Sequence, residues 1–191
     1  QLGEKLGKLH CYLADGAIRR VEIEVRGETV NELVKPIAAG LLKGILDKSI
    51  TDKVNYINAP LLAEENGLTV AQTKAASSLD YANLITCRVT WDGGERTLAG
   101  MLFGGVEPRI VQVDDYKLDA RPDGNVLVMQ NKDVHGVIGQ VGTILAAYEV
   151  NIAEWRMGRD KPGGQALSFI NLDSQPSKEV LEALNKIPAI T

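Results

Sequence analysis

The sequence predicts an α+β protein of two domains. Three observations support this prediction. The first half mixes helical spacing of leucines with strand-like alternation, a strong hairpin signal lies at residues 92–94, and the residues after 121 follow the order strand, helix, strand, strand, helix. We expect the boundary at the turn Arg-Pro-Asp-Gly, so that an α/β domain covers residues 1–121 and a second domain covers residues 122–191.

The composition is that of an ordinary globular protein. Of 191 residues, 45% are hydrophobic and 24% are charged, which allows a buried core and argues against disorder. The net charge of −4 and the lack of a clustered basic face argue against a nucleic-acid partner. No apolar run approaches the roughly 20 residues that span a bilayer, so we expect no membrane partner. Two distant cysteines, Cys11 and Cys87, support no metal site, and we expect a reducing, cytoplasmic setting.

Three helices and two strands are predicted in the first part of the first domain. The helices have apolar residues at helical spacing with a proline near the start or a glycine at the end, and they cover residues 2–14, 36–47 and 58–67. Residues 18–27 alternate between apolar and charged side chains, which is typical of a half-exposed strand. Residues 54–58 are expected to form a second, short strand.

A hairpin is the strongest local signal in the first domain. Residues 83–105 hold two alternating runs around the sequence Asp-Gly-Gly at 92–94, which is typical of a tight turn between antiparallel strands. Cys87 shares one alternating face with apolar neighbours, which indicates a buried strand position. We expect residues 107–109 to interrupt the sheet, and two further short strands to follow over residues 109–120.

The second domain has its elements in the order β-α-β-β-α. The predicted strands cover residues 125–131, 150–159 and 165–173, and the predicted helices cover residues 136–149 and 177–187. This order is most of a split β-α-β arrangement, in which two helices cover one face of a four-stranded antiparallel sheet. The fourth strand is missing because the sequence stops at Thr191, so we expect a fragment or a missing tail.

Three glycines at a spacing of three, Gly136, Gly139 and Gly142, open the first helix of the second domain. The spacing matches neither a dinucleotide fingerprint nor a P-loop, and it places the glycines on one helix face. The apolar residues on another face are Val137, Val141, Ile144, Leu145 and Tyr148. Each glycine lowers the stability of the helix by about 1 kcal/mol relative to alanine. Two explanations of what offsets this loss stay open: close packing of another backbone, or a small ligand whose carboxylate binds the N–H groups at the helix start.

The second domain resembles the ACT domain, the amino-acid-sensing module, in the sequences NKDVHGVIGQVGTILAAYEVNIAEWRMGR, GGQALSFINLD and EVLEALNKIPAI. This resemblance implies a ferredoxin-like βαββαβ fold whose last strand is truncated here. The first domain resembles the intervening, or allosteric substrate-binding, domain of the D-3-phosphoglycerate dehydrogenase family in VNYINAPLLAEENGL, SLDYANLITCRVTWDGGERTLAGMLFGG and EPRIVQVDDYKLDA. Together the two resemblances cover essentially the whole chain and identify it as the C-terminal regulatory part of a member of that family.

The resemblance implies a parent enzyme that oxidises 3-phosphoglycerate with NAD in L-serine biosynthesis. The dehydrogenase domains, which hold the NAD site and the catalytic residues, would precede this segment. We therefore expect no catalytic residue and no cofactor in this chain, whose partners would be those N-terminal domains and further copies in a homo-oligomer. In some members of the family, L-serine binds between paired ACT domains and inhibits the enzyme.

The resemblance also implies where an amino acid would bind. The candidate ligand-binding residues are Asn131, Asp133, His135, Gly136, Val137 and Asn151. The amide of Asn151 both donates and accepts, so it suits a zwitterion, whereas Asp133 suits either the ammonium of the ligand or a helix cap. The family loop usually has a proline where this chain has His135, and some relatives have a histidine in place of Asn131. Protonation of His135 would make anion binding depend on pH.

Other interpretations of the sequence stay open. In the first domain, Lys53 and Arg109 are candidate cations for a phosphorylated effector, and solvated surface charge is the simpler explanation for both. His10 is interpreted as a partly buried structural residue and not as a general base. The chain as a whole also fits the β chain of an iron–sulfur L-serine dehydratase, which combines similar domains, or an assembly module that binds nothing.

Overall fold

The chain folds into two compact units in a computed structural model. The structure describes residues 1–27, 32–48, 50, 53–75 and 83–191, so residues 78–82 of the family-like run quoted above lie outside the described residues. The units are Gln1–Asp114 and Asp115–Thr191. The division falls before the expected boundary at residue 121, because β6 (Tyr116–Ala120) packs against β8 (Ile152–Arg159) within the second unit.

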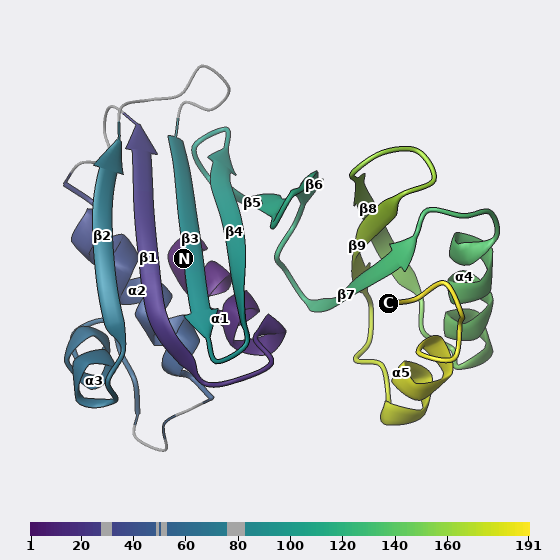
Figure 1. Ribbon diagram of the computed structural model, residues 1–191, viewed down its shortest axis with the longest axis horizontal. Coiled ribbons are helices and arrows are strands. Elements are labelled where there is room, and N and C mark those ends of the chain that lie inside the picture. Colours follow the sequence, from purple (N-terminus) through teal and green to yellow (C-terminus); the bar gives the residue numbers. More distant parts are fainter. Residues whose placement is uncertain (28–31, 49, 51–52, 76–82) are drawn as a thin grey trace. The chain divides into compact units, whose positions relative to one another are not determined.

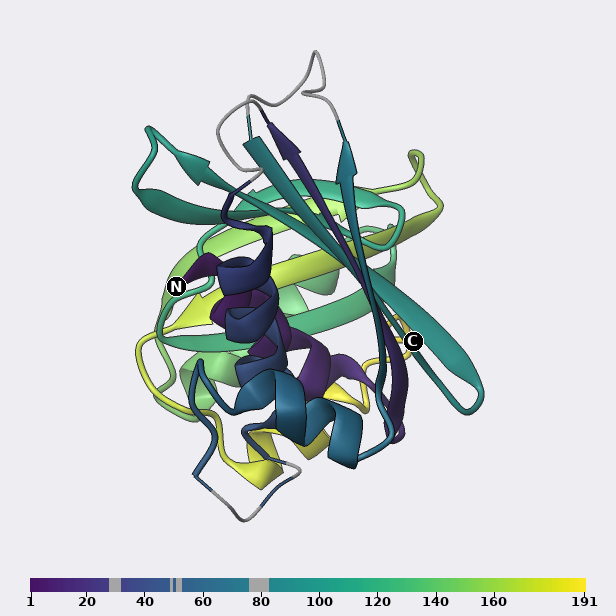
Figure 2. The ribbon, with the colours of Figure 1, turned by 90° about the vertical axis from the view of Figure 1, so that its left-hand side faces the viewer.

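The first unit is a sheet with helices on one face (Figures 1 and 2). Its described helices are α1 (Leu2–Leu13), α2 (Val34–Leu46) and α3 (Ala59–Glu65). Its described strands are β1 (Ile18–Gly27), β2 (Thr69–Ala75), β3 (Asn83–Trp91), β4 (Gly94–Phe103) and β5 (Glu107–Val113). The strands follow the order β2-β1-β3-β4-β5, in which β1 and β2 are parallel and the other pairs are antiparallel.

Local patterns predicted most of these elements correctly. The alternation of β1 buries Val21, Ile23 and Val25, and that of β3 buries Cys87, as expected for strands with one face on a core. The expected strand at residues 54–58 is wrong. Instead, the side chains of Asn55 and Asn58 accept hydrogen bonds from each other's backbone N–H groups, at 3.0 and 2.7 Å, and form a turn ahead of α3.

Two further features of the first sheet differ from the sequence analysis. Strand β2 was not predicted, because its alternating residues are mostly exposed or half-buried and polar. The interruption expected at residues 107–109 is also wrong, since these residues are already part of β5. The chain turns earlier, at Gly104 and Gly105, whose φ angles of 58° and 78° lie in the left-handed region that favours glycine.

Helices α1 and α2 pack with their backbones in contact. A Cβ atom built on Gly7 would collide with the backbone oxygen of Leu41, and one on Gly44 would collide with the backbone oxygen of Glu4. A Cβ on Gly3 would lie 2.8 Å from the oxygen of Ile37. Glycines at these positions therefore allow the two helices to approach more closely than any side chain would permit.

The second unit confirms the predicted β-α-β-β-α order. After β6, its elements are β7 (Asn125–Lys132), α4 (Val137–Ala147), β8, β9 (Gln165–Leu172) and α5 (Lys178–Leu184). The antiparallel strands follow the order β7-β9-β8. Ile190 forms a bridge to Asn131 on the other edge of β7, and the N–H of Thr191 donates to the oxygen of Gln130 at 3.1 Å. The last residues thus lie along the edge of β7 at which a fourth strand would pair, in agreement with a ferredoxin-like fold.

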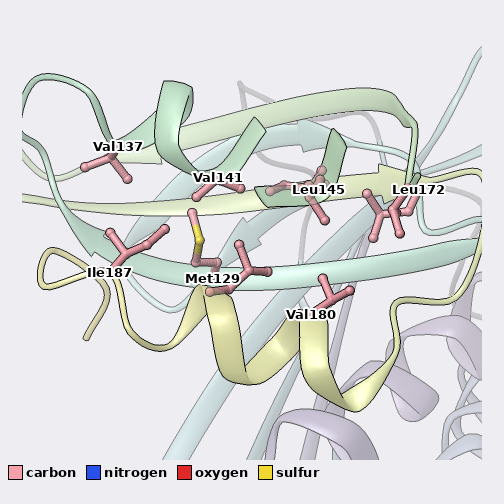
Figure 3. Packing of buried hydrophobic residues seen from close by; sticks show 10 residues of the cluster. Met129, Val137, Val141, Leu145, Leu172, Val180 and Ile187 are labelled. Carbon is pink, nitrogen blue, oxygen red and sulfur yellow. The ribbon is translucent and has the colours of Figure 1, made fainter. Parts of the chain in front are cut away.

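Helices α4 and α5 share one core with the sheet. Figure 3 shows Val137, Val141 and Leu145 of α4 directed toward Met129 of β7, with Val180 of α5 on the opposite side of the cluster. Two expectations for α4 need correction. Tyr148 is not part of the packed face, because it follows the helix and is 47% exposed. A Cβ at Gly139 or Gly142 would meet no described atom within 4 Å, so no backbone of the described chain packs against these glycines.

Candidate functional site

The start of α4 is open. Gly136 is its N-cap residue and has φ 86°, a left-handed conformation that favours glycine. No side chain in the described part of the chain caps this end. The first N–H groups of an 11-residue helix therefore face outward without a side-chain acceptor, at the positive end of the helix dipole. Such an end is suited to a carboxylate.

Asn131 brings a buried, unused acceptor to the same loop. Its side chain lies at the end of β7 and is 3% exposed. Its Nδ2 donates to the backbone oxygen of Lys132 at 2.7 Å, whereas its Oδ1 has no hydrogen-bond partner among the described residues. A buried acceptor without a donor costs about 1–3 kcal/mol. A ligand or a neighbouring molecule that supplies a donor would remove this cost.

Asp133 connects the loop to the turn between β8 and β9. Its Oδ2 accepts from the N–H of Gly163 at 3.0 Å and from Nη1 of Arg159 at 3.1 Å. The N–H of Gly163 and the guanidinium of Arg159 hold the pKa of this carboxyl below its usual value. Asp133 does not cap α4, so that alternative from the sequence analysis is wrong.

The other two loop residues have different environments. His135 is exposed and lies directly before Gly136, so its imidazole is accessible, and the pH dependence suggested for it stays a prediction. Val137 is 3% exposed and packs in the core of the second unit. Only the backbone of Val137 is placed to meet a ligand at the start of α4.

Asn151 lies at the opposite end of the sheet from Asn131. In the strand register, Asn131 pairs with Ala166 of β9, whereas Ile152, which follows Asn151, pairs with Leu172. These positions on β9 are six residues apart, about 20 Å along an extended strand. The Nδ2 of Asn151 donates to Oδ2 of Asp173 at 2.6 Å. One copy of the chain therefore does not bring the expected ligand residues together.

Lys53 and Arg109 lie far apart in the first unit. The backbone oxygen of Lys53 accepts from Nδ2 of Asn58 at 3.1 Å, beside α3, which packs against β2. Arg109 is on β5, which is separated from β2 by three strands, or about 19 Å. Its guanidinium donates to Oε2 of Glu107 at 3.0 Å and lies 5.6 Å from the ring centre of Phe103. Each cation would thus have to bind an anion by itself.

His10 and Cys87 form a buried pair in the first unit. His10 is fully buried, more than the sequence suggested, and its Nε2 lies 3.1 Å from the backbone oxygen of Cys87. Burial and, to a smaller extent, the charge of Arg96 lower the pKa of His10 to about 3, against the opposing effect of the hydrogen bond to the oxygen of Cys87. The ring is therefore neutral at physiological pH. Burial also raises the pKa of the Cys87 thiol. Neither side chain is placed to transfer protons to a ligand.

Comparison with known proteins identifies the family of the chain. A family model described as the D-3-phosphoglycerate dehydrogenase intervening domain matches residues 1–114, and a model of the ACT domain matches residues 125–189. The chain belongs to the D-3-phosphoglycerate dehydrogenase intervening-domain family. Its first match ends at the residue where the two compact units divide. The chain thus consists of the regulatory intervening and ACT domains of that family.

Curated relatives agree with this assignment. The chain is 35% identical to the D-3-phosphoglycerate dehydrogenase of Archaeoglobus fulgidus over 191 residues, which covers 99% of this chain and 36% of the relative. The corresponding enzyme of Synechocystis is 32% identical, with 100% of this chain and 34% of the relative covered. The enzyme of Bacillus subtilis is 29% identical, with 100% of this chain and 36% of the relative covered. The chain thus spans about a third of the length of these relatives.

No group of three or more histidine, cysteine or acidic side chains is placed to hold a metal ion within the described ranges. In the same ranges, no helix combines the length and the apolar character needed to cross a membrane.

Proposed function

We propose that this chain is the regulatory and oligomerising part of an NAD-dependent D-3-phosphoglycerate dehydrogenase of L-serine biosynthesis. In this proposal the second unit binds L-serine or a related small acid, and NAD and the substrate bind to the dehydrogenase domains of the same enzyme. The family match supports the parent enzyme. The arrangement of Asn131 and Asn151 at opposite ends of one sheet supports a ligand site made by two copies.

A two-fold symmetric dimer of second units would bring the separated ligand residues together. When two identical sheets lie antiparallel to each other, the loop at one end of the first copy lies near the opposite end of the second copy. The loop with Asn131 then meets Asn151 of the other copy, and the pair carries two equivalent sites. Each site combines an open helix start with amide groups from both copies.

The chemistry of such a site fits a zwitterionic amino acid. The N–H groups at the start of α4 would bind the α-carboxylate, since the helix dipole favours a negative charge there. The Oδ1 atoms of Asn131 and Asn151 are acceptors for the ammonium or hydroxyl of the ligand. The buried Oδ1 of Asn131 contributes most to this fit, because it is an acceptor with no other partner in the described chain.

Calorimetry with variant mixtures tests both the ligand and the two-copy site. We expect the chain to bind L-serine more tightly than D-serine, and Asn131→Ala and Asn151→Ala each to lose binding. When the two variants are dissociated, mixed in equal amounts and reassociated, half of the pairs are mixed and each mixed pair has one intact site. Binding then returns to about a quarter of the wild-type sites.

Two results would contradict the proposal. If the mixture binds no L-serine although each variant still forms pairs, the two asparagines do not meet across copies. If the wild-type chain gives no heat with L-serine or with 3-phosphoglycerate, the alternative of an assembly module that binds nothing is favoured. The β chain of an iron–sulfur dehydratase is the less favoured alternative, since the family match and the curated relatives are dehydrogenases.

A further inference from the structure

The first unit contains a cavity of about 480 Å³ that the ligand site of the second unit does not use. Its wall is formed by α1, α2 and the ends of β3 and β4. The apolar part of this wall includes Leu2, Ile37, Leu84 and Met101. The volume falls within the roughly 300–1,000 Å³ that is typical of small-molecule sites, and the predominance of apolar side chains is typical of them too.

A glycine of α2 forms part of the cavity wall. Gly40 lines the cavity in the interior of the helix, where glycine is less favourable than alanine. Unlike Gly7 and Gly44, it does not touch the backbone of α1 closely. A Cβ on Gly40 would lie 3.5 Å from the ring of Tyr56 and 3.6 Å from the backbone nitrogen of Glu4, which are ordinary contacts. Helix packing therefore leaves room for a methyl group at this position, and a larger side chain would have to enter the cavity.

The polar end of the cavity is preorganised and electrically balanced. Glu4 lines the cavity and accepts hydrogen bonds from Nζ of Lys43 at 2.5 Å and from the hydroxyl of Tyr56. These two bonds lower the pKa of Glu4 to about 2, so its carboxylate is ionised at neutral pH. Nζ of Lys43 also lies 4.9 Å from the ring centre of Tyr56, which holds the half-exposed tyrosine against the cavity wall.

The charge balance at this end selects between classes of ligand. Lys43 compensates Glu4. Lys8 lies 3.5 Å from the same carboxylate oxygen and is itself compensated by Asp47 at 3.6 Å, so an entering ion would find no unpaired opposite charge among the described residues at this end. Moving an ion from water to a mainly apolar cavity without such a partner is costly. A carboxylate has room for about four hydrogen bonds, and Glu4 accepts two from Lys43 and Tyr56, so it retains capacity for at least one more donor.

We infer that this cavity binds an uncharged, mainly apolar small molecule that carries one hydrogen-bond donor. The apolar body of the molecule lies between α1, α2 and the ends of β3 and β4, and its donor points to the carboxylate of Glu4. This site is separate from the amino-acid site proposed for the second unit and does not depend on it.

Binding of N-phenyl-1-naphthylamine to the whole chain tests the inference. This fluorescent probe is neutral, has an apolar ring system and carries one N–H. We expect saturable binding of one probe per chain. The sulfonated probe 1-anilinonaphthalene-8-sulfonate has the same rings with an added charge, and we expect it to bind at least tenfold more weakly. Equal affinity for both probes would overturn the assignment of an uncharged ligand.

A matched pair of variants locates the bound probe. Gly40→Leu fills the cavity, and we expect a tenfold or larger loss of affinity for N-phenyl-1-naphthylamine. Gly40→Ala, whose Cβ fits with ordinary contacts, keeps the fold and gives a smaller loss. The control is Gly139→Leu, the same change in α4 at a position with no described atom within 4 Å, and it should bind the probe like the wild type.

Four outcomes would overturn the inference. The first three are unchanged affinity in both Gly40 variants, an equal loss in Gly139→Leu, and displacement of the probe by L-serine. Displacement would place the probe in the amino-acid site. A probe affinity that rises with chain concentration would also overturn it, because the cavity would then be an interface between copies. Failure of the L-serine experiment leaves this test unaffected, since the probe does not need the second unit.

Discussion

Gly7 of α1 and Gly44 of α2 face each other so closely that a Cβ atom on either would lie 3.0 Å from a backbone carbon of the other. Each of these two Cβ atoms would also collide with a backbone oxygen of the opposite helix. This contact sets the distance between α1 and α2, and these helices form two walls of the cavity in the first unit. The close packing of two helices thus determines the shape of a candidate binding site.

Replacing either glycine should destabilise the first unit. We expect Gly7→Ala and Gly44→Ala to lower the free energy of unfolding by about 2–3 kcal/mol, because backbone atoms must move apart to admit a methyl group. Gly139→Ala is the control, since its methyl group enters open space and should raise helix stability by up to about 1 kcal/mol. Chemical denaturation of the three variants measures these differences. Equal stability of Gly7→Ala and the wild type would disprove the close contact.

His10 should make stability depend on pH below neutrality. Its pKa is about 3 in the folded chain and about 6.5 when exposed, so the unfolded chain takes up a proton that the folded chain does not. Its contribution is complete above about pH 6.5 and is lost as the pH falls toward 3, by up to about 5 kcal/mol. Denaturation at several pH values measures this slope. His10→Gln, which stays neutral and keeps a donor for Cys87, should show a flatter dependence than the wild type.

The two cysteines should differ in reactivity toward a thiol reagent. Cys11 is partly exposed, whereas Cys87 is fully buried and its thiol pKa is raised, so it forms little thiolate. We expect one fast-reacting thiol in the folded chain at pH 8 and two in denaturant. Cys11→Ser should remove the fast reaction. Rapid labelling of Cys87 in the folded chain would show that β3 is more accessible than the structure indicates.

The ion pair between Asp133 and Arg159 should support ligand binding more than stability. The side chain of Arg159 is half exposed and that of Asp133 is partly buried. Ion pairs near the surface contribute little to folding, but this pair holds the loop before α4 in place. We expect Asp133→Asn and Arg159→Gln each to weaken L-serine binding severalfold while the thermal midpoint changes little. In the double variant the losses should not add, because both changes remove one interaction. Additive losses would indicate that each residue contacts the ligand independently.

Local patterns explain how much of the fold could be predicted. The period of two along β3 buries Ile85, Cys87, Val89 and Trp91, as the alternation indicated, and the turn at residues 92–94 joins β3 and β4 as expected. The failures are equally local. At residues 54–58 the asparagine side chains bind backbone groups and replace a strand by a turn. Strand β2 has only a weak apolar pattern, so its sequence does not indicate a strand. Its extended conformation comes with its parallel pairing to β1.

The candidate site could be predicted only in part, because its contacts join residues that are far apart in the sequence. The open start of α4 and the loop residues were found from the glycines and the family resemblance. The partners of those residues were not found, since Arg159 is 26 residues from Asp133 in sequence and Asp173 is 22 residues from Asn151. The glycines that pack against another backbone are also not the expected ones. Gly139 and Gly142 face open space, whereas Gly7 and Gly44 each contact the opposite helix.

The amino-acid sequence by itself determined the order of elements in the second unit, most elements of the first unit with their buried faces, and the family resemblance. The elements and their faces follow from the fixed periods of strand and helix, which each short stretch carries within itself. Only the tertiary structure decided that Asn131 and Asn151 lie at opposite ends of a sheet, that α1 and α2 touch through glycine, and that a cavity opens beside Gly40. Such distances arise from packing between residues far apart in the chain, and no local period specifies them.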